Sequence, residues 1–203
     1  MKLSSFTTRD WVYVAVFGAL WGALELTLGA YLHVLFPPLA NTFFTGLIMA
    51  GIGAAIALVG YTFVPRPGAV LSIGIITALL KVVSLAGAKI GPVVAILAEV
   101  ILMEIALLSR RLPTRGRYTL AGTVAVSWNF FHKFIMMRLL YGTGIGEVYL
   151  KMVQEGSQTL GLDAGYAVAI VGVLFLFRVV AGAAAGWLAW DLGRLVARRA
   201  ARA

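Results

Sequence analysis

Six long and nearly uninterrupted apolar stretches constrain this chain more than any other feature. They occupy residues 11–35, 46–64, 69–86, 92–108, 118–140 and 165–190. Each approaches the roughly 20 residues that a helix needs to cross a bilayer. Of the 203 residues, 61% are hydrophobic and 12% are charged, whereas about a quarter of a soluble domain is charged. The sequence therefore predicts an all-α polytopic membrane protein, with six transmembrane helices in a single membrane domain that covers 1–203.

The lysines and arginines predict how these helices are oriented, because cytoplasmic loops carry the excess of both residues. With a cytoplasmic N-terminus, only Lys89 and Lys151 lie in outer loops. The inner segments then hold Lys2, Arg9, Arg66, Arg110, Arg111, Arg115, Arg117, Arg194, Arg198, Arg199 and Arg202. We expect both termini to be cytoplasmic. Topology then explains most of the formal net charge of +9, and nucleic acid is not an expected partner.

Small residues line one face of the first stretch. Ala15, Ala19 and Ala23 recur every four residues, with Gly18 and Gly22 beside them. Such faces let helix backbones approach closely, and close packing drives helix association in lipid. The spacing favours packing within this bundle, and docking to a separate membrane subunit is the alternative. A second strip, Gly182 and Gly186 in the last stretch, is expected to pack internally.

Ionisable residues inside the apolar stretches need a reason, because a central charge costs roughly 2.5 to 3.5 kcal/mol on insertion scales. Counting about 1.5 Å per residue from each outer helix end predicts two layers. The outer layer, about 8 to 12 Å deep by this count, holds Lys81, Glu99, His132 and Lys133. The deeper layer, about 15 to 20 Å down, holds Glu25, Glu104 and Arg178.

On the fifth stretch, the aromatic ring of Trp128 and the amide of Asn129 lie one helical turn from the outer layer. Together with the two layers, they predict a pocket that takes a small polar or heterocyclic molecule from outside. The expected substrate-binding residues are Glu25, Lys81, Glu99, Glu104, Trp128, Asn129 and His132. The alternative is structural, because buried charges also serve as ion pairs that fix helix register. In that case Lys81 would pair with Glu99, and Arg178 with Glu104.

No motif for catalysis, metal binding or a cofactor is present. Glu99 and Glu104 lie five residues apart, about 140° around a helix, and do not converge as metal ligands would. No phosphate-binding Gly-x-x-x-x-Gly-Lys motif occurs. We therefore expect no catalytic residue, metal or cofactor, and any ATP hydrolysis would occur in another chain.

Three other classes stay open at this point. A self-sufficient, proton-coupled secondary transporter would use Glu25, Glu104 and Arg178 as a relay. An intramembrane enzyme would turn over a substrate, and a structural assembly subunit would bind no small ligand.

The six stretches, the cytoplasmic termini, the missing nucleotide site and the Ala15-x-x-x-Ala19-x-x-x-Ala23 strip together resemble the S component of an energy-coupling factor (ECF) vitamin transporter. The resemblance covers essentially the whole chain. It implies a prokaryotic cytoplasmic membrane protein that binds a vitamin or precursor. It also implies that the alanine strip contacts a membrane T subunit, which is joined to two cytoplasmic ATPases.

Within that family, Pro67-Gly68-Ala69, Gly91-Pro92, Glu99 and Glu104 resemble the hydroxymethylpyrimidine/thiamine permease type, although Lys81 is more basic than that pattern suggests. The resemblance implies thiamine or hydroxymethylpyrimidine as the substrate. The segments Phe36 to Thr45 and Gly142 to Ala164 would cover the bound molecule. Such subunits are thought to topple in the bilayer, with energy from ATP hydrolysis in the partners.

Overall fold

The computed structural model describes residues 6–35, 42–83, 90–108, 113–142 and 144–202, and within these ranges it contains helices and no strand. The elements are α1 (Thr8–Leu35), α2 (Thr42–Phe63), α3 (Ala69–Val82), α4 (Ile90–Leu107), α5 (Arg115–Tyr141), α6 (Ile145–Leu160), the short 3-10 helix η1 (Ala164–Tyr166) and α7 (Ala167–Ala200). The all-α prediction is confirmed.

Helix ends follow from local hydrogen bonding. At the start of α1, Thr7 Oγ1 accepts from the Asp10 amide, and Asp10 Oδ2 accepts from the Thr7 amide at 2.8 Å, which is a reciprocal cap of two otherwise unpaired donors. Thr114 caps α5 by accepting from the Arg117 amide. Helices α5 and α6 end at Gly142 and Gly161 with φ of 64° and 66°, a conformation that glycine adopts without steric cost.

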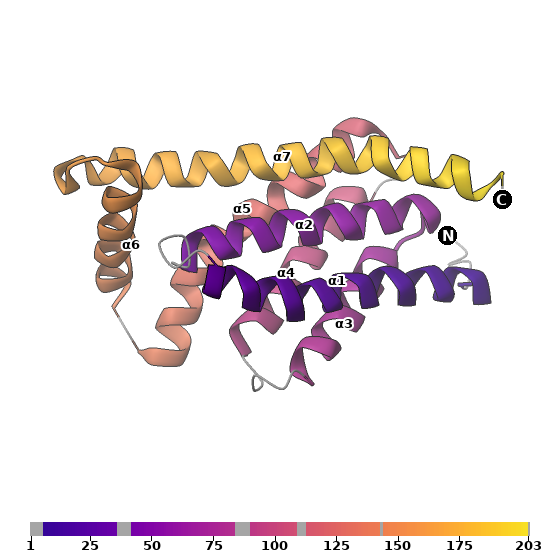
Figure 1. Ribbon diagram of the computed structural model, residues 1–203, viewed down its shortest axis with the longest axis horizontal. Helices are drawn as coiled ribbons and strands as arrows, with labels where there is room; N and C mark the ends of the chain where they lie inside the picture. The colour runs from indigo at the N-terminus through magenta and orange to yellow at the C-terminus, as the bar shows by residue number, and fades with distance from the viewer. Residues whose placement is uncertain (1–5, 36–41, 84–89, 109–112, 143, 203) are drawn as a thin grey trace.

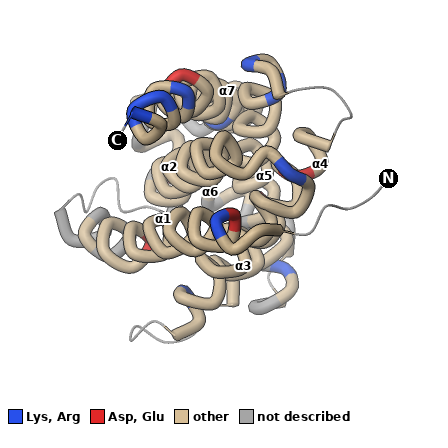
Figure 2. Tube along the Cα trace, turned by 90° about the vertical axis from the view of Figure 1, so that its right-hand side faces the viewer, with Lys and Arg blue, Asp and Glu red and all other residues tan. Residues whose placement is uncertain are grey.

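Helix α2 lies at the centre of the bundle and packs against α1, α3, α4, α5 and α7. Around it, α1 packs on α3, α3 on α4, α4 on α5 and α5 on α7. The end-on view shows α2 between α1 and α7 (Figure 2). Its small buried residues, including Ala50, Ala54 and Ala57, let the neighbouring helices approach closely.

Helix α6 crosses the long axis of the bundle at one end (Figure 1). It packs on α5 and α7, where Met152 and Val153 join Phe130, Ile170 and Leu174 in an apolar cluster separate from the main core. The segment Gly142 to Ala164 was predicted to be a loop that covers the bound molecule. It is largely a helix with one apolar face.

Among the described residues, four helices are long and apolar enough to cross a membrane by length and composition: Thr8–Leu28 of α1, Thr45–Phe63 of α2, Ile90–Leu107 of α4 and Ala167–Ala200 of α7. The predicted third stretch gives an apolar helix of only 14 residues. The fifth gives the 27-residue α5, which is less apolar because it carries Asn129, His132, Lys133 and Arg138.

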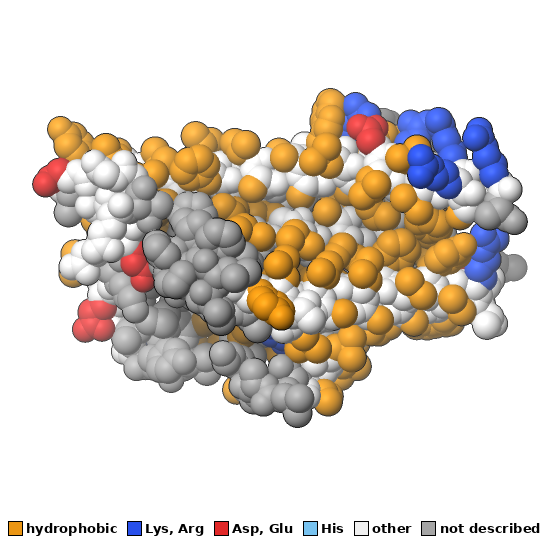
Figure 3. Space-filling model, in the orientation of Figure 1, with side chains coloured by type: hydrophobic (Ala, Val, Ile, Leu, Met, Phe, Trp, Pro, Cys, Tyr) orange, Lys and Arg blue, Asp and Glu red, His pale blue; other side chains and the backbone are white. Residues whose placement is uncertain are grey.

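Charges on the surface are segregated along the bundle. On the face that Figure 3 shows, most Lys and Arg side chains gather at the end where α7 finishes, with one acidic side chain beside them, and the other acidic side chains lie at the opposite end. Hydrophobic side chains cover the length between. Helix α1 begins at the same end where α7 finishes (Figure 1). This distribution suits a molecule whose middle contacts lipid.

Candidate functional site

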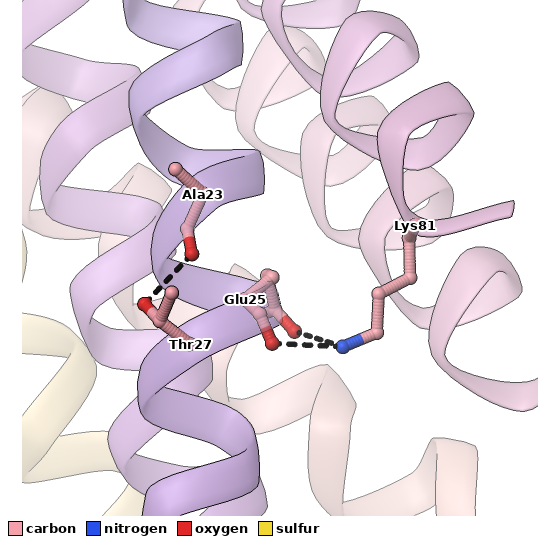
Figure 4. A network of polar contacts seen from close by, with 4 residues as sticks. All are labelled: Ala23, Glu25, Thr27 and Lys81. Atoms are coloured by element: carbon pink, nitrogen blue, oxygen red, sulfur yellow. Dashed lines mark hydrogen bonds and ion pairs between the residues drawn. The ribbon is translucent and has the colours of Figure 1, made fainter. Parts of the chain in front are cut away.

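An ion pair joins α1 to α3 inside the bundle (Figure 4). Lys81 Nζ lies 3.1 Å from Glu25 Oε2 and donates to the Glu25 carbonyl at 3.0 Å. The Lys81 and Glu25 side chains are 17% and 12% exposed. A charge removed from water needs a counter-charge close by, and each of these residues supplies it to the other.

A second polar group joins α4, α5 and α7. Asn129 Nδ2 donates to Glu99 Oε1 at 3.2 Å, and Asn129 Oδ1 accepts from an Arg178 terminal nitrogen at 3.3 Å. Glu99 and Arg178 are 3% and 1% exposed. The amide of Asn129 therefore bridges a buried carboxylate and a buried guanidinium.

The two groups lie within electrostatic range of each other, since the charges of both Glu25 and Arg178 act on Glu99. We call Glu25, Lys81, Glu99, Asn129 and Arg178 the polar cluster. It draws side chains from α1, α3, α4, α5 and α7, and it places acceptors and donors of both charge signs inside an otherwise apolar bundle.

Two neighbours shape the polar cluster. A Cβ at Gly46 of α2 would lie 2.9 Å from Asn129 Oδ1, so a glycine there leaves the amide room. The Arg178 guanidinium lies 5.7 Å from the centre of the Phe130 ring, within range of a cation–π contact. Because Phe130 also packs against α6, the polar cluster and α6 share a side chain.

Two buried indole N–H groups have no hydrogen-bond partner among the described residues: those of Trp21 and Trp128. Trp21 is fully buried and lies against Gly53 of α2. An unsatisfied buried donor costs about 1 to 3 kcal/mol, so both groups are candidates to bind a ligand acceptor. Trp21 was missed as a candidate, although it lies one helical turn before Glu25, on the same face.

His132 is buried on α5 and hydrogen-bonds the backbone of Gly91 at the start of α4. This contact links the interior of α5 to the start of α4. The side chains of Lys133 and His33 lie outside the described residues, as does most of Phe36 to Thr45, so those expectations stay predictions.

An ion pair crosses the predicted division into two layers. Glu25 was placed in the deeper layer and Lys81 in the outer one, yet they form an ion pair. The depth count assumed that every helix ends at the same plane. Helix α3 has 14 residues and is about 21 Å long at 1.5 Å per residue. This length is shorter than the thickness of a bilayer core, which is about 30 Å.

The predicted structural pairs are also wrong. Lys81 binds Glu25 rather than Glu99, and Arg178 donates to Asn129 rather than to Glu104. The relay proposed for a proton-coupled transporter, through Glu25, Glu104 and Arg178, is not formed by these contacts. The expected groups of ionisable residues are present inside the bundle, but their partners differ.

Glu104 is not part of the polar cluster. Its Oε1 accepts from the Gly68 amide at 2.6 Å and its Oε2 from the Leu71 amide at 3.2 Å. Gly68 has φ of 89° and caps α3. A carboxylate at a helix N-terminus satisfies unpaired amides and faces the positive end of the helix dipole. Glu104 thus caps α3, and its role in substrate binding stays a prediction.

The two small-residue strips of α1 differ in burial. Gly18 and Gly22 are buried, and a Cβ on either would collide with Ile76 or Leu80 of α3. Ala15, Ala19 and Ala23 are all exposed. The glycines therefore pack α1 against α3, whereas the alanines face outward. The spacing of the alanines had favoured packing within the bundle.

The glycines of α7 were predicted to pack internally, and this is confirmed. A Cβ at Gly182 would lie 2.8 Å from the backbone of Thr123 on α5, and a Cβ at Gly186 would lie equally close to Thr119. Backbones of α5 and α7 thus touch directly, as small residues at helix crossings allow.

In the described part of the chain, no group of three or more His, Cys, Asp or Glu residues is placed to hold a metal ion. The polar cluster has hydrogen-bonding and ion-pairing capacity for a small molecule. Its residues show no nucleophile–base arrangement among their contacts.

Comparison with known proteins gives one family. Residues 8–194 match the family model described as hypothetical bacterial integral membrane protein (Trep_Strep). No curated protein and no solved structure matches the chain. Because the match covers most of the chain and several helices are long enough to cross a bilayer, the protein is a multi-pass protein of a bacterial membrane and belongs to the Trep_Strep family.

Proposed function

We propose that this chain is the substrate-capture S component of an ECF-type importer, and that it is not itself an enzyme. It would bind a vitamin or vitamin precursor outside and deliver it with a membrane T subunit and two cytoplasmic ATPases. The observation that carries the proposal is the outward face of Ala15, Ala19 and Ala23. The chain uses the neighbouring glycines for its own packing and leaves the alanines for another helix.

The proposed topology has six membrane helices, α1 to α5 and α7, with both termini cytoplasmic. The basic end of the bundle in Figure 3 supports this orientation, because Lys and Arg concentrate on the cytoplasmic side. Helix α3 is too short to cross alone. It would pack against α1, α2 and α4, with part of its surface exposed.

The proposed ligand site is the polar cluster with Trp21, Trp128 and His132. Buried charges and amide groups inside a membrane bundle mark functional sites by default, because each is costly in lipid. The first substrate to test is thiamine or hydroxymethylpyrimidine. Glu99 would face the cationic ring of thiamine, and the indole N–H groups would bind acceptors on the heterocycle.

The docking part is tested with Ala19→Trp, which places a large ring in the middle of the outward strip. We expect co-purification with coexpressed T and ATPase subunits to fall by at least about tenfold, because close backbone approach is lost. The control is Ala184→Trp, an exposed position on α7, which does not pack against α1. Equal recovery of both variants would refute docking through α1.

The ligand part is tested by mass spectrometry of small molecules retained through purification. A vitamin or precursor is expected, and its absence under conditions that keep the protein folded would contradict substrate capture. Uptake by this chain alone in proteoliposomes, abolished by an uncoupler, would instead establish the proton-coupled transporter.

A further inference from the structure

The last three turns of α7 form an exposed basic surface. Arg194, Arg198 and Arg199 are all exposed, and the last two make no side-chain hydrogen bond or ion pair with any described residue. Figure 3 shows this cluster at the end of the molecule where α7 finishes. Exposed apolar side chains share these turns, namely Leu192, Leu195 and Val196, with exposed fractions of 50%, 49% and 38%.

Two tryptophans place this surface relative to the bilayer. Trp187 and Trp190 lie just before it, and tryptophan concentrates at the membrane–water interface. The Arg115 guanidinium lies 4.3 Å from the Trp187 ring centre, and the Arg194 guanidinium lies 5.3 Å from that of Trp190. Arg115 also pairs with Asp191. The polar boundary of the bundle therefore runs through these residues.

Distances along α7 bring the free arginines to the lipid phosphates. Arg194 is four residues past Trp190, about 6 Å along the axis, and Arg198 is about 12 Å past it. The headgroup zone is roughly 5 to 7 Å thick on each side. Arg194 then lies at phosphate depth, and the long side chain of Arg198 reaches back to it.

From these observations we infer that the end of α7 is a binding surface for anionic phospholipid headgroups. The arginines supply positive charge at phosphate depth, and the leucines beside them contact the upper acyl chains. A helix that projected into water would expose those leucines without gain. The surface lies at the opposite end of the bundle from α6 and does not depend on the proposed function.

The test measures lipid binding to the purified full chain in detergent by native mass spectrometry. The probes are phosphatidylglycerol and phosphatidylcholine with identical acyl chains. Wild type should bind phosphatidylglycerol at least about tenfold more tightly. In the triple variant R194Q/R198Q/R199Q that preference should fall below about twofold. Equal binding of both lipids by wild type, or an unchanged preference in the triple variant, would overturn the inference.

Three further arms separate the causes. The variant R138Q changes an arginine in the last turn of α5. It should keep the preference for phosphatidylglycerol. R194K/R198K/R199K retains the charge and should keep most of it, and loss equal to that of the glutamine variant would refute an electrostatic surface. Inorganic phosphate should displace the lipid no better than sodium chloride of equal ionic strength. Specific displacement would show a site for free phosphate and overturn the lipid assignment.

Discussion

Glu99 and Glu104 lie five residues apart on α4, and both are buried, yet they do different work. Glu104 gives both oxygens to backbone amides of α3. Within the described part of the chain, Glu99 accepts a hydrogen bond from the side-chain amide of Asn129, and the charges of Glu25 and Arg178 act on it. A carboxylate held by backbone amides is committed to the fold. A carboxylate that is bound by side chains can release one of these side chains and bind a ligand instead.

The strongest test of this contrast is Glu104→Ala, which leaves the Gly68 and Leu71 amides without their acceptor. We expect the free energy of unfolding to fall by about 3 kcal/mol, because two partly buried donors lose charge-assisted hydrogen bonds. Unfolding by SDS in mixed micelles measures it. Glu147→Ala, at an exposed acidic residue in the first turn of α6, is the control and should change it by less than about 0.5 kcal/mol.

Removing the bridge at Asn129 should have the next largest effect. Asn129→Ala takes one hydrogen bond from Glu99 and one from Arg178, so we expect a loss of about 2 kcal/mol in unfolding free energy. The same SDS titration applies. Ile135→Ala truncates an exposed side chain on α5 and serves as the control. A loss no larger than that of the control would show that the bridge does not stabilise the bundle.

The smallest expected effect sharpens the contrast by ligand binding. Glu99→Gln keeps an acceptor for Asn129 but removes the negative charge, so the dissociation constant for thiamine should rise about tenfold, or about 1.4 kcal/mol. Glu104→Gln should change it by less than about twofold. Titration of both variants in detergent measures the difference. Equal affinities would end the assignment of Glu99, rather than Glu104, to the ligand.

Much of the fold followed from apolar pattern alone, because a chain in lipid must satisfy its backbone within helices. Helix α6 was missed since the search followed long apolar runs. Its signal was shorter: Met152, Val153 and Gly156 at helical spacing in a polar background. The end of α3 at Val82 was also missed, because the search followed the apolar stretch to residue 86.

The sequence predicted which ionisable residues lie inside the bundle, but it did not predict which of them pair with each other. The cost of burying charge correctly singled out Glu25, Lys81 and Glu99 as residues that need partners. The partner of each residue depends on how far neighbouring helices are shifted along their axes and on how each helix is rotated about its own axis. Residue spacing within a single helix predicts neither the shift nor the rotation. The same limit applied to α1, where the alanine and glycine strips are one residue apart, about 100° around the axis.

Helices α1 and α3 are fastened to each other along most of their contact. Gly18 and Gly22 let α3 come close, Thr77 donates to the Gly18 carbonyl at 3.0 Å, and Lys81 binds Glu25. With bonds at two levels, α3 cannot slide or roll independently of α1. We therefore expect a partner that displaces α1 from its outer side to displace α3 together with it.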